Sequence, residues 1–257
     1  MEFENKQNDL AFVDEVVSEH KKRWKRGTNK LKVGVSFATV LLMLYSVLLF
    51  LPINKGLDEV IATRTLLLYI LYGIVALALA FLCAQNYLRG LSRFATLFEG
   101  GGKRSLFLVR WGFIISAAGV VLQMMVFFGL NMGASSITFG NLILGNALLL
   151  AGAVVGIVGF LSLATAKGMT DDGRKGALHM SWSTLVIFAG AVLLSYALYK
   201  GWALKVVCTL VNLTGACLFY KQWKRIIAWP ETDAKQEMPA PAENQEDVPT
   251  EREETKE

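Results

Sequence analysis

The sequence predicts an all-α integral membrane protein: a bundle of six transmembrane helices followed by a disordered, acidic C-terminal tail. Two observations carry this prediction. Of the 257 residues, 54% are apolar and 18% are charged, and the mean hydropathy is +0.43, which is too apolar for a soluble domain. The chain also contains six apolar runs, each about as long as the 20 helical residues that cross a hydrocarbon core. This composition argues against a soluble enzyme, a secreted disulfide scaffold and a disordered regulator.

The six predicted spans follow one another with short polar or glycine-containing connections. At about 1.5 Å per helical residue, each can cross roughly 30 Å of hydrocarbon. Only a few residues around Lys200 and Gly201 separate the last two, which predicts a tight helical hairpin with the glycine at its bend. If the spans pair in order, they form three parallel hairpins. The spans are 33–53, 65–87, 106–130, 139–165, 177–199 and 202–221.

Three regions follow from these spans: a basic segment over residues 1–32, the membrane domain over residues 33–221, and a tail over residues 222–257. Within the first region, residues 10–24 have the apolar spacing of an amphipathic helix, which lies either at the membrane interface or in solvent. The tail is rich in Glu and Pro without apolar periodicity, which predicts disorder from about residue 229.

The charges are unevenly divided along the chain. The last 29 residues, 229–257, contain ten acidic and three basic residues, a net charge of −7, which leaves +12 on residues 1–228 of a chain whose total is +5. With both termini in the cytoplasm, nineteen Lys and Arg residues of residues 1–228 fall on the cytoplasmic side and four on the other. We therefore expect a multi-pass, N-in and C-in protein of the bacterial inner membrane. The four cations on the other side are Lys55, Arg64, Lys200 and Lys205.

Small residues mark one face of the third span and one face of the fourth. Helices in lipid associate largely through close backbone contact, which glycine and serine permit. The spacing predicts that these two faces pack against each other within the chain, with a dimer interface as the alternative. The residues are Gly112, Ser116 and Gly119 in the third span, and Gly145, Gly152, Gly156 and Gly159 in the fourth.

Four polar residues in the half of the spans away from the termini form the candidate functional site: Gln123, Asn146, Lys205 and Asn212. One hypothesis is an outward-open polar vestibule with Lys205 as its cationic end, suited to an anion or a small polar solute. The alternative is that the amides join helices by hydrogen bonds while the lysine extends to the lipid headgroups.

The spacing of small residues in two of the predicted hairpins also resembles that of a known family of membrane proteins. Gly112 and Gly119 in one hairpin, and Ser183 and Gly190 in another, lie seven residues apart on helices that begin with a basic residue. Over about residues 103–225, this layout resembles the HdeD-type six-span bacterial membrane proteins. The tryptophan-proline turn associated with the hairpin tips of that family is missing here. The resemblance implies a role in envelope stress and no catalytic mechanism.

Catalytic and cofactor chemistry has little support in the sequence. The six spans contain no Asp or Glu, so the usual carboxylate relay of a cation-coupled transporter or proton pump is absent. We find no nucleophile elbow, zinc-protease motif, Walker loop or dinucleotide fingerprint, and no Cys and His spacing typical of a metal site. The bases adjoin apolar runs, which argues against nucleic acid as a partner. We predict no cofactor and no metal.

The sequence therefore predicts a non-enzymatic membrane protein that acts through interactions, in the membrane and through its cytoplasmic ends. Its expected partners are membrane lipids and a protein bound through the acidic tail, and a homo-oligomer is possible. The alternative is a small transporter or channel for a neutral or anionic solute, which would use the polar face of the candidate site.

Overall fold

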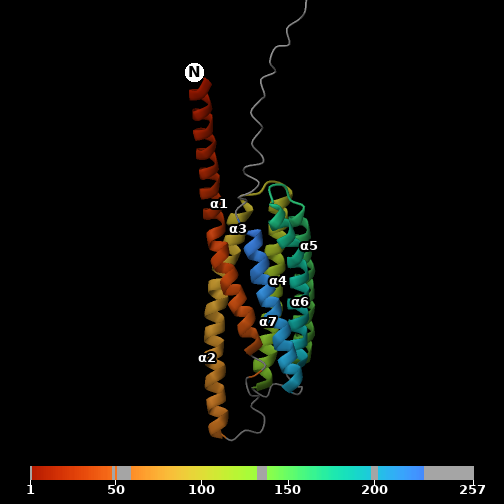
Figure 1. Ribbon diagram of the computed structural model, residues 1–257. Helices are drawn as coiled ribbons and strands as arrows, with labels where there is room; N and C mark the ends of the chain where they lie inside the picture. Colours follow the sequence, from red (N-terminus) through yellow and green to blue (C-terminus); the bar gives the residue numbers. More distant parts are fainter. Residues whose placement is uncertain (1, 48–49, 51–58, 132–137, 198–201, 229–257) are drawn as a thin grey trace, which may run out of the picture.

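The computed structural model describes residues 2–47, 50, 59–131, 138–197 and 202–228. These residues form helices joined by turns and contain no strand, and six helices are long and apolar enough to cross a membrane (Figure 1). The predicted all-α, six-helix membrane architecture is confirmed.

The helices run as follows along the chain. Five of the six crossings are single α-helices, and one is assembled from α2, a π-helical turn and α3. The elements are α1 Glu2–Val47, α2 Glu59–Cys83, η2 Ala84–Leu88, α3 Arg89–Ala95, α4 Gly101–Asn131, α5 Thr138–Ala164, α6 Asp171–Ala197 and α7 Trp202–Ile226.

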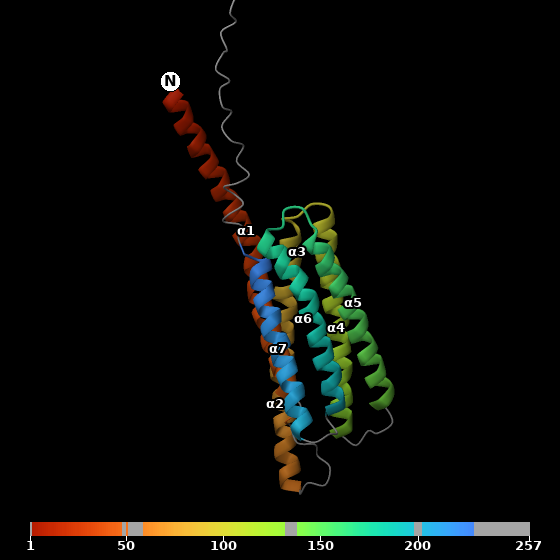
Figure 2. The same ribbon diagram turned by 45° about the vertical axis from the view of Figure 1, so that its right-hand side comes forward.

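The helices are arranged around a ring whose order differs from their order in the chain. Neighbouring contacts run from α2 to α1, then to α7, α6, α5 and α4, and α3 contacts α4 to close the ring at one end. The first helix therefore packs against the last. The helical pairs α4–α5 and α6–α7 are compact hairpins, whereas α2 extends beyond the other helices at one end of the bundle (Figures 1 and 2).

The two ends of the bundle differ in charge. The start of α4 and the ends of α5 and α7 lie at the end from which α1 projects, at the top of Figure 1. We call this the basic end, because all described Lys and Arg residues belong to it except Arg64 and Lys205, which lie near the opposite, or far, end.

Helix α1 is longer than predicted. The sequence separates an amphipathic helix over residues 10–24 from a span over residues 33–53, but the structure makes Glu2–Val47 one continuous helix. The residues between the two segments, such as Lys25, Asn29 and Lys30, include no proline, and the one glycine among them, Gly27, is buried against Leu97. The helix therefore continues through the boundary and projects from the basic end (Figures 1 and 2). Residues 51–53 of the predicted span lie outside the described residues.

The second crossing continues beyond its predicted end at residue 87. A π-helical turn, η2, connects α2 to α3 without a break, and the crossing extends to Ala95. Close approach to α1 occurs at this turn, because a Cβ atom on Gly34 would meet backbone atoms of Tyr87 and Asn86. A π turn inserts one residue into the helical repeat, and such turns occur mostly as single turns inside α-helices.

Three other helices have ends that differ by several residues from the predicted spans. Helix α4 begins at Gly101 rather than 106. Helix α6 begins at Asp171 rather than 177, since the Thr170 hydroxyl accepts a hydrogen bond from the Gly173 N–H at 2.9 Å and caps the first turn. Helix α7 continues to Ile226 rather than 221. Its last turn contains Lys224 and Arg225, whose charges favour a helix C-terminus.

The buried side chains form one cluster at each end of the bundle. The cluster at the basic end is aromatic, and Trp223 at its centre is fully buried with edge-to-face contacts to Tyr87 and Phe160. The cluster at the far end is smaller and includes Tyr45, Tyr69 and Leu149. Outside these clusters, the exposed faces are apolar along most of the bundle, as expected for helices that contact lipid.

Candidate functional site

A chain of hydrogen bonds connects three helices near the far end. The Tyr45 hydroxyl on α1 donates to Oε1 of Gln123 on α4. Nε2 of Gln123 in turn donates to Oδ1 of Asn146 on α5 at 2.6 Å. Gln123 is 5% exposed, so its side chain is removed from lipid and satisfied at both ends by protein atoms.

Asn212 on α7 makes a second set of contacts with α1. Its Nδ2 atom donates at 2.7 Å to both the Leu42 carbonyl oxygen and the Ser46 hydroxyl. The side chain is fully buried, and its Oδ1 atom has no hydrogen-bond partner among the described residues. The first span is thus bound to the last by a residue pair separated by 166 positions in the chain.

The two sets of contacts meet on α1, because Tyr45 and Ser46 are consecutive residues. We call Tyr45, Ser46, Gln123, Asn146 and Asn212 the polar hub. The structure thus brings three of the four predicted site residues to one turn of α1. Tyr45 and Ser46 were missed by the sequence analysis, although polar atoms in the outer part of an apolar span are the signal that marks them.

Lys205, the fourth predicted site residue, is separate from the polar hub. It is half-buried on α7, seven residues before Asn212, which places it about 10 Å away along the helix axis. In the described part of the chain no hydrogen bond or ion pair connects its ammonium group to the hub. The geometry of the hub is that of helix-joining amides, and the predicted cationic end of a vestibule lies outside it.

The hydrogen bond between Gln123 and Asn146 should contribute a measurable free energy to the stability of the protein. We expect Gln123→Leu and Asn146→Leu each to lower the thermal stability of the detergent-solubilised protein. The double variant should lose less than the sum, with a coupling of about 0.6–2 kcal/mol, because each single change leaves the partner amide without this hydrogen bond. Thermal unfolding of the four proteins measures this coupling. The matched control is the pair Asn146→Leu and Ser36→Ala, because Ser36 is exposed and its hydroxyl bonds only a carbonyl oxygen of its own helix. The losses of stability in this control pair should add. If the losses caused by Gln123→Leu and Asn146→Leu also add, the hydrogen bond between the two amides is contradicted.

The predicted small-residue faces lie in the interface of α4 and α5. A Cβ atom on Gly112 would come within 2.6 Å of the Gly156 nitrogen and 2.8 Å of the Gly152 oxygen. Similarly, a Cβ atom on Gly119 would come within 2.7 Å of the Gly145 oxygen. Backbone contacts this close are possible only with glycine at these positions.

The remaining predicted members of the stripe are placed differently from one another. Ser116 contacts Gly152, and Gly159 lies against Val109, whose nitrogen a new Cβ atom would approach to 2.8 Å. The Cα–H of Gly156 instead points toward α6, where a Cβ atom would meet only the Thr184 methyl group at 4.0 Å. The small residues of α5 therefore allow close packing against two neighbouring helices, α4 and α6.

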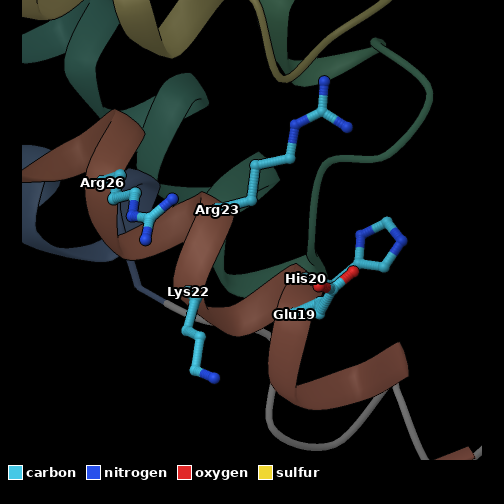
Figure 3. A pocket seen from close by; sticks show the side chains of 5 residues that line it. All are labelled: Glu19, His20, Lys22, Arg23 and Arg26. Atoms are coloured by element: carbon cyan, nitrogen blue, oxygen red, sulfur yellow. The ribbon is translucent and has the colours of Figure 1, made fainter. Parts of the chain in front are cut away.

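At the basic end, the exposed side of α1 carries a dense set of charges. Figure 3 shows an open hollow beside this helix, and every labelled side chain around it comes from α1. Four of the five are cationic or titratable bases. The residues are Glu19, His20, Lys22, Arg23 and Arg26.

Helix α1 is fixed to the end of α7 just below these charges. The Trp24 indole nitrogen donates at 3.0 Å to the Ile227 carbonyl oxygen, and the ring packs edge-to-face on Phe94 at 5.5 Å between centroids. The last described residues before the acidic tail, Ile227 and Ala228, therefore lie beside the basic segment of α1.

Comparison with known proteins adds no relative. No protein-family model matches this chain, and no curated protein and no solved structure matches it significantly. The resemblance to HdeD-type proteins therefore stays a prediction from layout and spacing. Among the described residues, no group of three or more His, Cys, Asp or Glu side chains could hold a metal ion.

Proposed function

We propose that this chain is a non-enzymatic, multi-pass membrane protein that binds a partner protein beside the membrane through the basic segment of α1 and the acidic C-terminal tail. One observation carries the proposal. Helix α1 continues beyond the bundle as a single helix, and from residue 19 to residue 26 every described side chain except Trp24 is exposed (Figures 1 and 2).

The direction of α1 favours a protein as the partner. An amphipathic helix that binds a lipid surface lies in the plane of that surface. In both views α1 instead leaves the bundle from its end, pointing away from the other helices. Its charges therefore reach into the aqueous compartment, where an acidic protein surface would be guided to them by long-range attraction.

The hydrogen bonds of the intramembrane amides favour a role in protein interaction over a role in solute transport. A transport site needs polar groups that can release protein partners and bind a solute. In the hub, the amide nitrogens of Gln123 and Asn212 donate to acceptors of neighbouring helices. The hub thus stabilises the membrane domain as an anchor.

We place the basic end of the bundle in the cytoplasm of a bacterium and the bundle in its inner membrane. The support is the distribution of cations, since Lys and Arg are retained on the cytoplasmic side during insertion. From the resemblance to HdeD-type proteins, we propose that the partner acts in the response to envelope stress.

The partner can be tested by exchanging the charges of α1. Tagged wild type, K22E/R23E/R26E and a chain that ends at residue 228 would be purified from native membranes in mild detergent, and co-purifying proteins quantified by mass spectrometry. We expect a stoichiometric companion with wild type, reduced about tenfold or more in the charge-reversed variant because like charges would then face each other. The shortened chain should also lose it.

A matched control separates this contact from general electrostatics. The variant K167E/R174E/K175E reverses three exposed cations at the same end of the bundle, on α6 and the turn before it instead of on α1 or α7. It should retain the companion. If no stoichiometric companion is present with wild type, or the control loses it equally, the proposal is wrong.

A further inference from the structure

Three arginines lie on the surface where α3 packs against α4. Arg89 and Arg93 are four residues apart on α3 and both are exposed, with Ser92 on the same face. Arg110 extends from α4, and its Nη1 atom donates at 3.1 Å to the Ser92 hydroxyl. This bond places the Arg110 guanidinium on the face that carries the other two. We call Arg89, Arg93 and Arg110 the arginine triad.

The triad has no acidic counterpart within the described chain. Among the described residues, no carboxylate forms an ion pair with any of its three members, and Glu99, in the turn that connects α3 to α4, is exposed and forms no ion pair there. Three guanidinium groups repel one another, more strongly beside apolar surface than in water. An anion that contacts all three would relieve this repulsion, and guanidinium groups match phosphate oxygens with paired hydrogen bonds.

The surroundings of the triad are apolar and aromatic. Arg110 lies nine residues after the start of α4, about 14 Å along the helix and about one turn after the apolar run begins at residue 106. Phe107 and Trp111 flank it, 56% and 46% exposed, with their ring centroids 6.0 Å apart. Exposed aromatic rings beside cations are typical of the layer where lipid headgroups meet acyl chains.

The triad is presented by a rigid backbone. The opposite face of α3 is locked onto α1, because a Cβ atom on Gly90 would come within 2.6 Å of the Leu31 backbone. Leu91 and Phe94 on that face are buried. Arginine side chains anchored on a fixed helix lose less freedom on binding than those on a mobile segment.

We propose that the arginine triad is a binding site for an anionic phospholipid, whose phosphate contacts Arg89, Arg93 and Arg110 and whose acyl chains lie along Phe107 and Trp111. Ser92 is a positioning residue, since it holds the Arg110 guanidinium without itself carrying charge. A soluble phosphate would use the same cations but would gain nothing from the aromatic pair. This site is separate from the α1 segment of the proposed function and does not depend on it.

The test measures binding of fluorescently labelled phosphatidylglycerol to the full-length protein in a neutral detergent. Unlabelled phosphatidylglycerol, phosphatidylcholine and inorganic phosphate serve as competitors. We expect R89Q/R93Q/R110Q to weaken binding about tenfold or more, because juxtamembrane cations contribute strongly to anionic lipid binding. The control K167Q/K175Q/K224Q removes the same charge from the same end and should stay within about twofold of wild type, because charges away from the site act weakly.

Two further variants keep the test independent of folding. R89Q/R93Q leaves the Arg110 to Ser92 bond in place and removes only exposed groups, yet it should still weaken binding. Ser92→Ala leaves every charge in place and should weaken binding by a smaller factor, a change that simple charge counting does not produce.

Three results would overturn the proposal. Equal weakening in the triad and control variants would mean diffuse electrostatic attraction. Competition by phosphatidylcholine as strong as that by phosphatidylglycerol would mean that the negative headgroup is not recognised. Competition by inorganic phosphate as strong as that by phosphatidylglycerol would identify a soluble phosphate as the ligand instead.

Discussion

Gly152→Ala is expected to disrupt the packing of α4 against α5, whereas Gly156→Ala in the same helix is expected to be tolerated. A Cβ atom on Gly152 would collide with Ser116 Oγ and come within 2.6 Å of the Ser116 nitrogen and 2.7 Å of the Gly112 oxygen. Backbone atoms cannot move aside without separating the helices, so we expect a loss of about 3 kcal/mol. At Gly156 the only new contact is ordinary, with the Thr184 methyl group at 4.0 Å.

Thermal unfolding followed by fluorescence-detected size exclusion in detergent would measure both variants. Gly140→Ala is the control for a glycine of α5 with open space around it, since a Cβ atom there meets nothing within 4 Å. Sequence spacing alone predicts equal effects at the two ends of the Gly152-x-x-x-Gly156 motif. Equal melting temperatures for these two variants would therefore contradict the arrangement of α4, α5 and α6.

Gly34→Ala is expected to have the second large effect, by forcing α1 away from the π turn. A Cβ atom at this position would collide with the Tyr87 nitrogen and come within 2.5 Å of its Cα and 2.7 Å of the Asn86 carbonyl carbon. All three are backbone atoms of η2, so the helices must separate or the π turn must change. We expect a destabilisation of about 3 kcal/mol, comparable to overpacking of a tight core.

The matched control for Gly34 is Gly27→Ala, seven residues earlier on the same helix. A Cβ atom there would press on the tip of the Leu97 side chain, whose nearest atom is 2.9 Å away and can rotate aside. A much smaller loss of stability is expected, measured by the same melting experiment. If the two alanine variants unfold at the same temperature, α1 does not cross the π turn as described.

Much of the fold could be predicted because a membrane imposes few choices. Backbone polar groups in lipid must be satisfied within a helix, so apolar runs of sufficient length identify the crossings. The glycine faces of α4 and α5 were equally visible, since close approach requires small residues at helical spacing. The continuity of α1 through residues 25–32 was not visible, because polar residues there break the apolar run but not the helix. The π turn at Ala84–Leu88 also leaves no local pattern.

The candidate site was predicted in part, for a related reason. Gln123, Asn146 and Asn212 are conspicuous as amides in apolar helices. Which groups they bond depends on how distant helices pack, and spacing within one helix contains no such information. Tyr45 and Ser46 became part of the hub only because α1 packs against α7 and its Tyr45 side chain reaches α4 at this level, so a ring order that differs from chain order decides the contacts.

The pairing of the first helix with the last has a consequence for how the protein is made. Trp24 and its acceptor at Ile227 are 203 residues apart, and synthesis of that length takes roughly 10–40 s at typical rates. Throughout this interval, the surface of α1 that will contact α7 has no permanent neighbour. Until then this surface must be covered by lipid or by the insertion machinery, and ring closure can follow only after α7 has been synthesised.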